Sequence, residues 1–241
     1  MRRLSGSAPG IRELDLLVAS CCACPRLVAW REDVAKVKRL SFRGETYWGR
    51  GVPGFGPDDA RVLIVGLAPA AHGANRTGRM FTGDRSGDFL YAALHRTGFA
   101  SQPTSEHIGD GLALTDLRIT APVHCAPPAN KPTPDELRTC SAYLDRELQL
   151  LAPTVRVILT LGSIGWLALL RALADGGWSI PRPRPSFAHG AEVGLEHSDG
   201  RRLCVLGCYH VSQQNTFTGR LTPAMLDAVL VRAREIATTD P

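Results

Sequence analysis

The sequence predicts an α/β fold of three layers, α/β/α, built around a central parallel sheet of four strands. Three observations lead to this prediction. Four short apolar segments are spaced along the chain at the intervals typical of α/β proteins. Stretches with helical periodicity separate these segments, and a glycine-rich run directly follows the first of them. Because strands that alternate with helices usually pair in parallel, helices are expected to cover both faces of the sheet.

The expected elements follow one another in a regular order. Residues 1–10 are polar and contain glycine, so we expect a flexible tail there, and residues 11–20 can form a short helix. The expected strands are 61–66, 112–120, 155–161 and 203–207, and the expected helices are 86–97, 134–151, 163–174 and 223–237. The second of these helices has a clear start, since Thr133 and Glu136 have the spacing of a capping box.

The composition is that of one globular domain spanning residues 1–241. Hydrophobic residues make up 44% of the chain and charged residues 21%, and the formal net charge is +5. This charge suits an acidic partner but is too small to demonstrate nucleic-acid binding. No segment has the apolar length of a membrane span or the core of a signal peptide. We therefore expect a cytoplasmic, unexported protein with no membrane partner.

Four of the seven cysteines have a spacing that suggests a metal site. Cys21 and Cys24 form a C-x-x-C pair, and Cys125 and Cys140 form a wider pair about a hundred residues later. Four thiolates suit a tetrahedral zinc ion or an iron–sulfur cluster, and spacing alone does not choose between these metals. Buried thiols with no metal are the alternative. The other three cysteines, which stand outside the pattern, are Cys22, Cys204 and Cys208.

Three loops carry candidate polar residues that the predicted topology brings to one place. Asp84 ends the glycine-rich run 66–84, Asn130 follows the second strand, and His210 and Asn215 follow the last strand. In parallel sheets, ligands bind beyond the carboxyl ends of the strands. The sequence therefore predicts a polar site at this edge of the sheet.

Each candidate also has a plain structural interpretation. Asp84 can simply cap the helix that follows it, and Asn130 can be an ordinary turn residue. His210 can be a structural histidine, and Phe81 can be a core aromatic residue. A phosphate-binding function is disfavoured, because the glycine-rich run lacks both the Gly-Lys-Ser/Thr ending and the G-x-G-x-x-G spacing.

Five motifs, in one order along the chain, are similar to those of the uracil-DNA glycosylase superfamily, and specifically of its family 5 (type b) iron–sulfur enzymes. They are CPRLVAWRE at 24–32, VPGFG at 52–56, GLAP at 66–69 leading to FTGD at 81–84, CAPPANKP at 125–132 and YHVSQQNT at 209–216. The resemblance covers roughly residues 14–235. Leu67 stands where neighbouring families carry Glu, so the carboxylate role passes to Asp84. Met80 departs from the proline expected before Phe81.

The resemblance implies a uracil-DNA glycosylase-like fold and a monofunctional enzyme that flips a base out of double-stranded DNA and hydrolyses its glycosidic bond. Uracil is the implied base, with hypoxanthine and ethenocytosine as further substrates, and the product is an abasic site for base excision repair. Asp84 would polarise water or stabilise the cationic sugar, and His210 would donate a hydrogen bond to the departing base. Asn130 would contact the base or the water through its amide.

The remaining implied roles concern DNA and the cofactor. Base contacts are expected from Ala68, Phe81 and Asn215, and DNA contacts from Ser212, Gln213, Gln214 and Arg220. The resemblance assigns Cys21, Cys24, Cys125 and Cys140 to a structural [4Fe–4S] cluster. It further implies a monomer that acts on uracil-containing DNA of the nucleoid. The alternative is a non-catalytic iron–sulfur DNA-binding module of the same fold.

Overall fold

The computed structural model describes residues 6–239 and places one five-stranded sheet at the centre of the chain. The strand order is β2-β1-β3-β5-β4. The strands are β1 (Val62–Val65), β2 (Leu117–Thr120), β3 (Val157–Leu161), β4 (Glu192–Glu196) and β5 (Arg202–Cys208). β1, β2, β3 and β5 pair in parallel, which confirms the four predicted strands.

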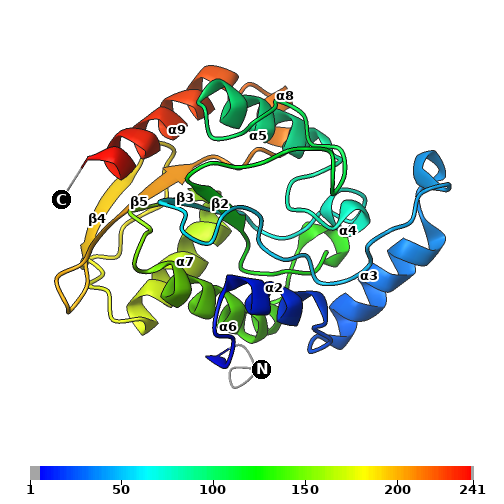
Figure 1. Ribbon diagram of the computed structural model, residues 1–241, viewed down its shortest axis with the longest axis horizontal. Coiled ribbons are helices and arrows are strands. Elements are labelled where there is room, and N and C mark those ends of the chain that lie inside the picture. The colour runs from blue at the N-terminus through cyan, green and yellow to red at the C-terminus, as the bar shows by residue number, and fades with distance from the viewer. Residues whose placement is uncertain (1–5, 240–241) are drawn as a thin grey trace.

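Helices cover both faces of this sheet (Figure 1). The helices are α2 (Ile11–Ala19), α3 (Pro25–Val37), α4 (Ala74–Thr77), α5 (Arg85–Arg96), α6 (Pro134–Leu151), α7 (Ser163–Asp175), α8 (Gln213–Phe217) and α9 (Pro223–Thr238), with 3-10 turns at Leu40–Phe42 and Pro128–Asn130. Apolar side chains of α5 and α9 pack on one face of the sheet, and those of α6 and α7 pack on the other. The three-layer prediction is confirmed.

The sheet differs from the predicted one in a fifth strand. β4 pairs antiparallel with β5 at the edge of the sheet. Along β4 only Leu195 is buried, and both glutamates are exposed. An edge strand with one solvated face alternates polar and apolar residues, so β4 lacks the continuous apolar run by which the other strands were found.

The second strand is shorter than the predicted 112–120. Leu112 and Leu114 are buried as part of a core cluster, but regular pairing begins only at Leu117. Asp116 has φ of 57°, a left-handed conformation that interrupts the extended backbone. Two leucines of this segment are therefore buried although the segment is not a strand.

The N-terminal region is ordered further than the expected tail at 1–10. Residues 1–5 lie outside the described part of the chain. Ala8 is buried, and its carbonyl oxygen accepts hydrogen bonds of 3.0 and 2.7 Å from the guanidinium of Arg146. Between residues 6 and 239, none of the helices has both the length and the apolarity to cross a membrane.

Candidate active site and cysteine pocket

Four loops leave the sheet at the carboxyl ends of its parallel strands. The register pairs Val65 with Thr120 and with Thr160, so β1, β2 and β3 end side by side. Gly66 donates its backbone N–H to the carbonyl of Thr120 (2.9 Å), and Gly162 donates to the carbonyl of Cys208 (2.8 Å). The segments that carry Asp84, Asn130 and His210 therefore begin at one edge of the sheet, as the topology predicted.

Two rings from separate loops meet above this edge. The ring centroids of Phe81 and His210 are 6.3 Å apart. Gly66 lies against Phe81, since a Cβ at Gly66 would stand 3.0 Å from the Cζ of that ring. Gly162 lies against His210 in the same way, because its Cβ would be 3.3 Å from the Cβ of the histidine. The two glycines let both rings approach the strand ends closely.

Burial sets the protonation state of His210. Desolvation lowers the pKa of its imidazole to about 4, so the ring is neutral near pH 7. The Asn215 side-chain amide donates a hydrogen bond of 2.8 Å to the His210 carbonyl. The backbone oxygen of Asn215 accepts from the N–H of Leu221. Asn215 therefore closes the loop between His210 and Leu221. It does so with the side-chain amide that was expected to contact the base.

Asp84 is the N-cap of α5, as the plain structural interpretation predicted. Its Oδ1 accepts a hydrogen bond of 3.0 Å from the Gly87 backbone N–H. Burial is the main cause that raises the pKa of the carboxyl above its ordinary value. Gly73 approaches so closely that a Cβ there would lie 2.1 Å from Oδ2. One carboxylate oxygen is thus used by the helix, and the missing side chain at Gly73 leaves room for the other.

Asn130 occupies an exposed 3-10 turn between β2 and α6. It and Ala129 both have left-handed backbone conformations, with φ of 55° and 52°. Its backbone N–H donates to the carbonyl of Pro127 (3.1 Å). Within residues 6–239, no hydrogen bond directly joins Asn130, Asp84 and His210. The structure thus pairs Phe81 with His210 and places Asn130 on a separate turn.

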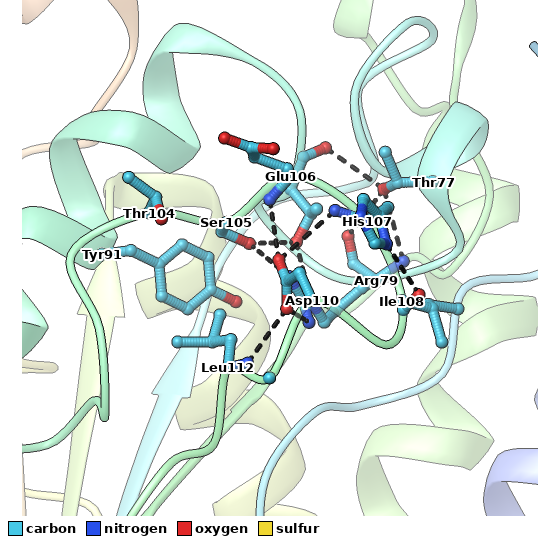
Figure 2. Close-up of polar contacts among 12 residues, drawn as sticks. Thr77, Arg79, Tyr91, Thr104, Ser105, Glu106, His107, Ile108, Asp110 and Leu112 are labelled. Carbon is cyan, nitrogen blue, oxygen red and sulfur yellow. Dashed lines mark hydrogen bonds and ion pairs between the residues drawn. The ribbon is translucent and has the colours of Figure 1, made fainter.

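A buried ionic network, which the sequence analysis missed, fixes the segment just before Phe81 (Figure 2). Arg79 is only 5% exposed, and its guanidinium binds both carboxylate oxygens of Asp110 at 2.8 and 2.5 Å. It also donates to the hydroxyls of Thr82 (3.0 Å) and Ser105 (2.9 Å). The contact with Arg79 is the main cause that holds the pKa of Asp110 well below its ordinary range.

The network ties the loop around residue 110 to the glycine-rich run. Asp110 also accepts hydrogen bonds from the backbone N–H groups of Glu106 and Leu112, which closes its own loop. On the other side, the Tyr91 hydroxyl donates to the carbonyl of Met80 (2.8 Å). Phe81 sits between these anchors with φ of 51°, a conformation that costs energy for a residue other than glycine. The anchors hold this strained residue in place.

A second arginine braces the same run. Arg76 donates to the carbonyl of His72 and to the carbonyl of Gly83, both at 2.9 Å. Its guanidinium also pairs with Glu45 and lies 4.0 Å from the ring centroid of Phe42. The sequence offered no signal for either arginine, because the carboxylate partner of each lies 31 residues away in the chain.

The loop after His210 presents polar groups and one ring to solvent. Ser212 precedes α8, and the exposed side chains in this loop include those of Gln213, Gln214 and Arg220. The guanidinium of Arg220 lies 4.7 Å from the ring centroid of Tyr209. Phe217, at the end of α8, is 72% exposed. The sequence analysis missed this aromatic residue, because its exposure becomes visible only in the folded chain.

The four paired cysteines line one small cavity. Cys21 and Cys24 come from the link between α2 and α3, Cys125 comes from the loop after β2, and Cys140 lies on α6. Burial raises the pKa of the Cys24 thiol to about 11 and also raises the pKa of Cys125 and Cys140. Elsewhere, Cys204 and Cys208 lie in β5.

Four cysteine sulfurs around one cavity are a donor set that suits a metal cofactor. In the part of the chain that the structure describes, no set of three or more His, Cys, Asp or Glu side chains is placed to hold a single ion. A four-iron cluster takes one thiolate at each iron, so its ligands stand around a cavity, as the four cysteines do. His124 lines the same cavity with a buried Nε2 that has no partner. The donor set therefore fits a cluster.

The cysteine pocket and the candidate active site are in contact. Ala68, from the glycine-rich run, packs against the apolar cluster that contains Cys125 and Cys140. A rigid cysteine pocket would thus support the start of the run that leads to Phe81 and Asp84.

Comparison with known proteins identifies the family. A family model described as "Uracil DNA glycosylase superfamily" matches residues 53–234. The type-5 uracil-DNA glycosylase of Mycobacterium leprae (strain TN) is 56% identical over 97% of this chain and 99% of its own length. The protein of that name from Mycobacterium bovis is 54% identical over 97% of this chain and 84% of its own length. The type-5 uracil-DNA glycosylase of Thermus thermophilus is 52% identical over 91% of this chain and 95% of its own length. The resemblance in the motifs is confirmed: the chain belongs to the uracil-DNA glycosylase superfamily and, within it, to the type-5 family.

Proposed function

We propose that this protein is a monofunctional uracil-DNA glycosylase that flips uracil out of double-stranded DNA and hydrolyses its bond to deoxyribose, leaving an abasic site for base excision repair. The observation that carries this proposal is the similarity to type-5 uracil-DNA glycosylases, which runs through every segment of the candidate site. All the proposed site residues come from one chain, so a monomer suffices, and DNA of the nucleoid is its substrate.

Breaking the glycosidic bond leaves positive charge on the sugar and negative charge on the base. Asp84 supplies negative charge on the sugar side, where its Oδ2 can orient a water or stabilise the cationic sugar. His210 acts on the base side as a neutral N–H donor, because its lowered pKa keeps it uncharged. In this way the two groups would stabilise both charges that develop in the transition state.

The base itself is held by one ring and by amides. Phe81, fixed by its strained backbone and the neighbouring network, stacks on the extruded base. The Asn130 amide contacts the pyrimidine edge or the water, and the backbone at Ala68 supports the opposite edge. Asn215 acts through His210, since its side chain holds that residue's carbonyl.

The loop that carries α8 forms the DNA-facing surface. Ser212, Gln213, Gln214 and Arg220 contact phosphates next to the extruded nucleotide. Phe217 is the side chain best suited to fill the vacated stack, because it is the exposed ring of this loop.

Cys21, Cys24, Cys125 and Cys140 hold a [4Fe–4S] cluster in this proposal. The cluster, when bound, supplies a crosslink between the N-terminal helices, the loop after β2 and α6. Glycosidic hydrolysis transfers no electrons, so the role is structural. Through Ala68 the crosslink supports the glycine-rich run.

The decisive experiment measures base release from oligonucleotides that carry uracil, hypoxanthine or ethenocytosine, in single- and double-stranded form. The substitution Asp84→Asn removes the charge but keeps a good helix cap. We expect it to lower uracil excision by about 10²-fold or more, with unchanged duplex affinity and thermal stability. Full activity of Asp84→Asn would refute the role of Asp84. A wild-type protein that binds duplex without releasing any base would instead be the non-catalytic iron–sulfur module.

A further inference from the structure

Arg31 is a buried cation at the edge of the cysteine pocket. It lies on α3 and is only 2% exposed. Its Nη1 donates a hydrogen bond of 2.9 Å to the Sγ of Cys125. Its Nη2 donates to the Cys21 carbonyl (2.9 Å) and lies 3.8 Å from the Sγ of Cys22. The guanidinium thus bridges the two cysteine segments that are far apart in the chain.

Arg31 differs from the other buried arginines because no carboxylate neutralises its charge. Three other arginines of the described chain are buried, and each pairs with a carboxylate. Arg118 binds Glu147 and Asp15, Arg79 binds Asp110, and Arg76 binds Glu45. Among the ion pairs of residues 6–239, none joins Arg31 to a carboxylate, and its Nε is buried without a partner. Its polar contacts on the pocket side are to sulfur and to a carbonyl.

A buried cation without a counter-charge is strongly unfavourable. The groups that can carry negative charge beside Arg31 are the cysteine sulfurs. Four thiolates bring more negative charge than an iron–sulfur core offsets, so the site as a whole is negative when it is loaded. The arginine and the loaded site therefore each supply the charge that the other lacks.

We propose that Arg31 is the counter-ion of the iron–sulfur site: it donates to the Cys125 ligand sulfur, compensates the negative charge of the loaded pocket, and thereby sets the retention and reduction potential of the cluster. This inference rests on the proposed cluster and adds a residue that is no ligand. Hydrogen bonds and charge next to ligand sulfurs are general determinants of cluster potential and stability.

The test compares two substitutions at Arg31 with one on the same helix. Arg31→Met keeps the length of the side chain and removes the charge, whereas Arg31→Lys keeps the charge. Arg26→Met is the matched control, because Arg26 also lies on α3 but pairs with Glu136 and touches no sulfur. The readouts are iron per protein, the rate of bleaching in air and the midpoint potential of the cluster.

We expect Arg31→Met to bleach several-fold faster than wild type and to have a more negative midpoint potential, since an added electron is no longer stabilised by the cation. Arg31→Lys should lie close to wild type, and Arg26→Met should match it. A folded Arg31→Met protein with full iron and an unchanged potential would overturn the proposal. So would an Arg31→Lys protein that is as impaired as Arg31→Met.

Two further outcomes are decided within the same experiment. If Arg31→Met does not fold, Arg31→Gln takes its place, and equal iron retention by the Gln and Lys variants refutes a role for charge. If wild-type protein purified without oxygen contains no iron, the cluster and the role of Arg31 are both wrong. Uracil excision measured on the same preparation keeps the proposed function separate, because activity without iron contradicts only the cofactor.

Discussion

Replacing Gly73 by alanine tests the position of the Asp84 carboxylate without changing any proposed site residue. A Cβ at Gly73 would lie 2.1 Å from Oδ2 of Asp84, whereas ordinary contacts begin near 3.4 Å. The carboxylate or the backbone of the run must therefore move by about 1 Å. A misplacement of this size can cost about 10²-fold in rate, which corresponds to about 2.7 kcal/mol in the transition state.

The effect on folding should be much smaller. The displacement weakens the hydrogen bond from Gly87 to Oδ1, and loss of an N-cap costs about 1 kcal/mol. The assay is single-turnover release of uracil from duplex DNA, with unfolding in urea followed in parallel. Gly194→Ala in β4 is the matched control, because a Cβ there meets no atom within 4 Å.

A double-mutant cycle identifies the route of the effect. If Gly73→Ala acts by displacing Asp84, it should cost little rate in a protein that already carries Asp84→Asn. A folded Gly73→Ala protein with the wild-type excision rate would show that the placement of Asp84 is irrelevant to the reaction. If Gly73→Ala lowers the excision rate equally in the wild-type and Asp84→Asn backgrounds, the glycine acts through some other group.

Three further predictions concern the buried network, the cysteine pocket and the histidine. Asp110→Ala leaves the Arg79 cation buried without a partner, so urea unfolding should show a loss of about 3–5 kcal/mol, and wild-type stability would contradict the importance of the pair. Cys140→Ala should lose bound iron in a metal assay, whereas Cys204→Ala should retain it; the reverse result would reassign the ligands. His210→Gln should slow excision by about 10²-fold at every pH between about 5 and 8, since the pKa of His210 is lowered to about 4 and the ring stays neutral there. The pKa of His210 in the folded protein lies below its ordinary value of 6.5. The contribution of His210 to the free energy of unfolding should therefore be present above pH 6.5 and be lost as the pH falls toward about 4. Unfolding of the wild-type protein and of His210→Gln, measured as a function of pH, checks the direction of this change.

Local patterns in the sequence were enough to predict the layers of the fold. Helix starts depend on residues within one turn, and the predicted capping box at Thr133 and Glu136 is present with both of its hydrogen bonds. The apolar strands were found because buried parallel strands are continuous hydrophobic runs. β4 was not predicted, because an edge strand has one solvated face and lacks a continuous apolar run. Residues 112–116 were wrongly predicted as part of a strand, because apolar residues can be buried without forming one.

The sequence by itself determined the α/β/α architecture, the edge of the sheet at which the loops with the candidate residues begin, and the four cysteines that share one cavity. Each of these follows from periodicity, from short motifs or from the geometry of parallel strands. Only the tertiary structure decided which charges are buried together. Arg79 meets a carboxylate 31 residues away, and Arg31 meets a sulfur 94 residues away. Pair energies and the pKa of His210 depend on burial, and burial is a property of the packed chain that no local pattern carries.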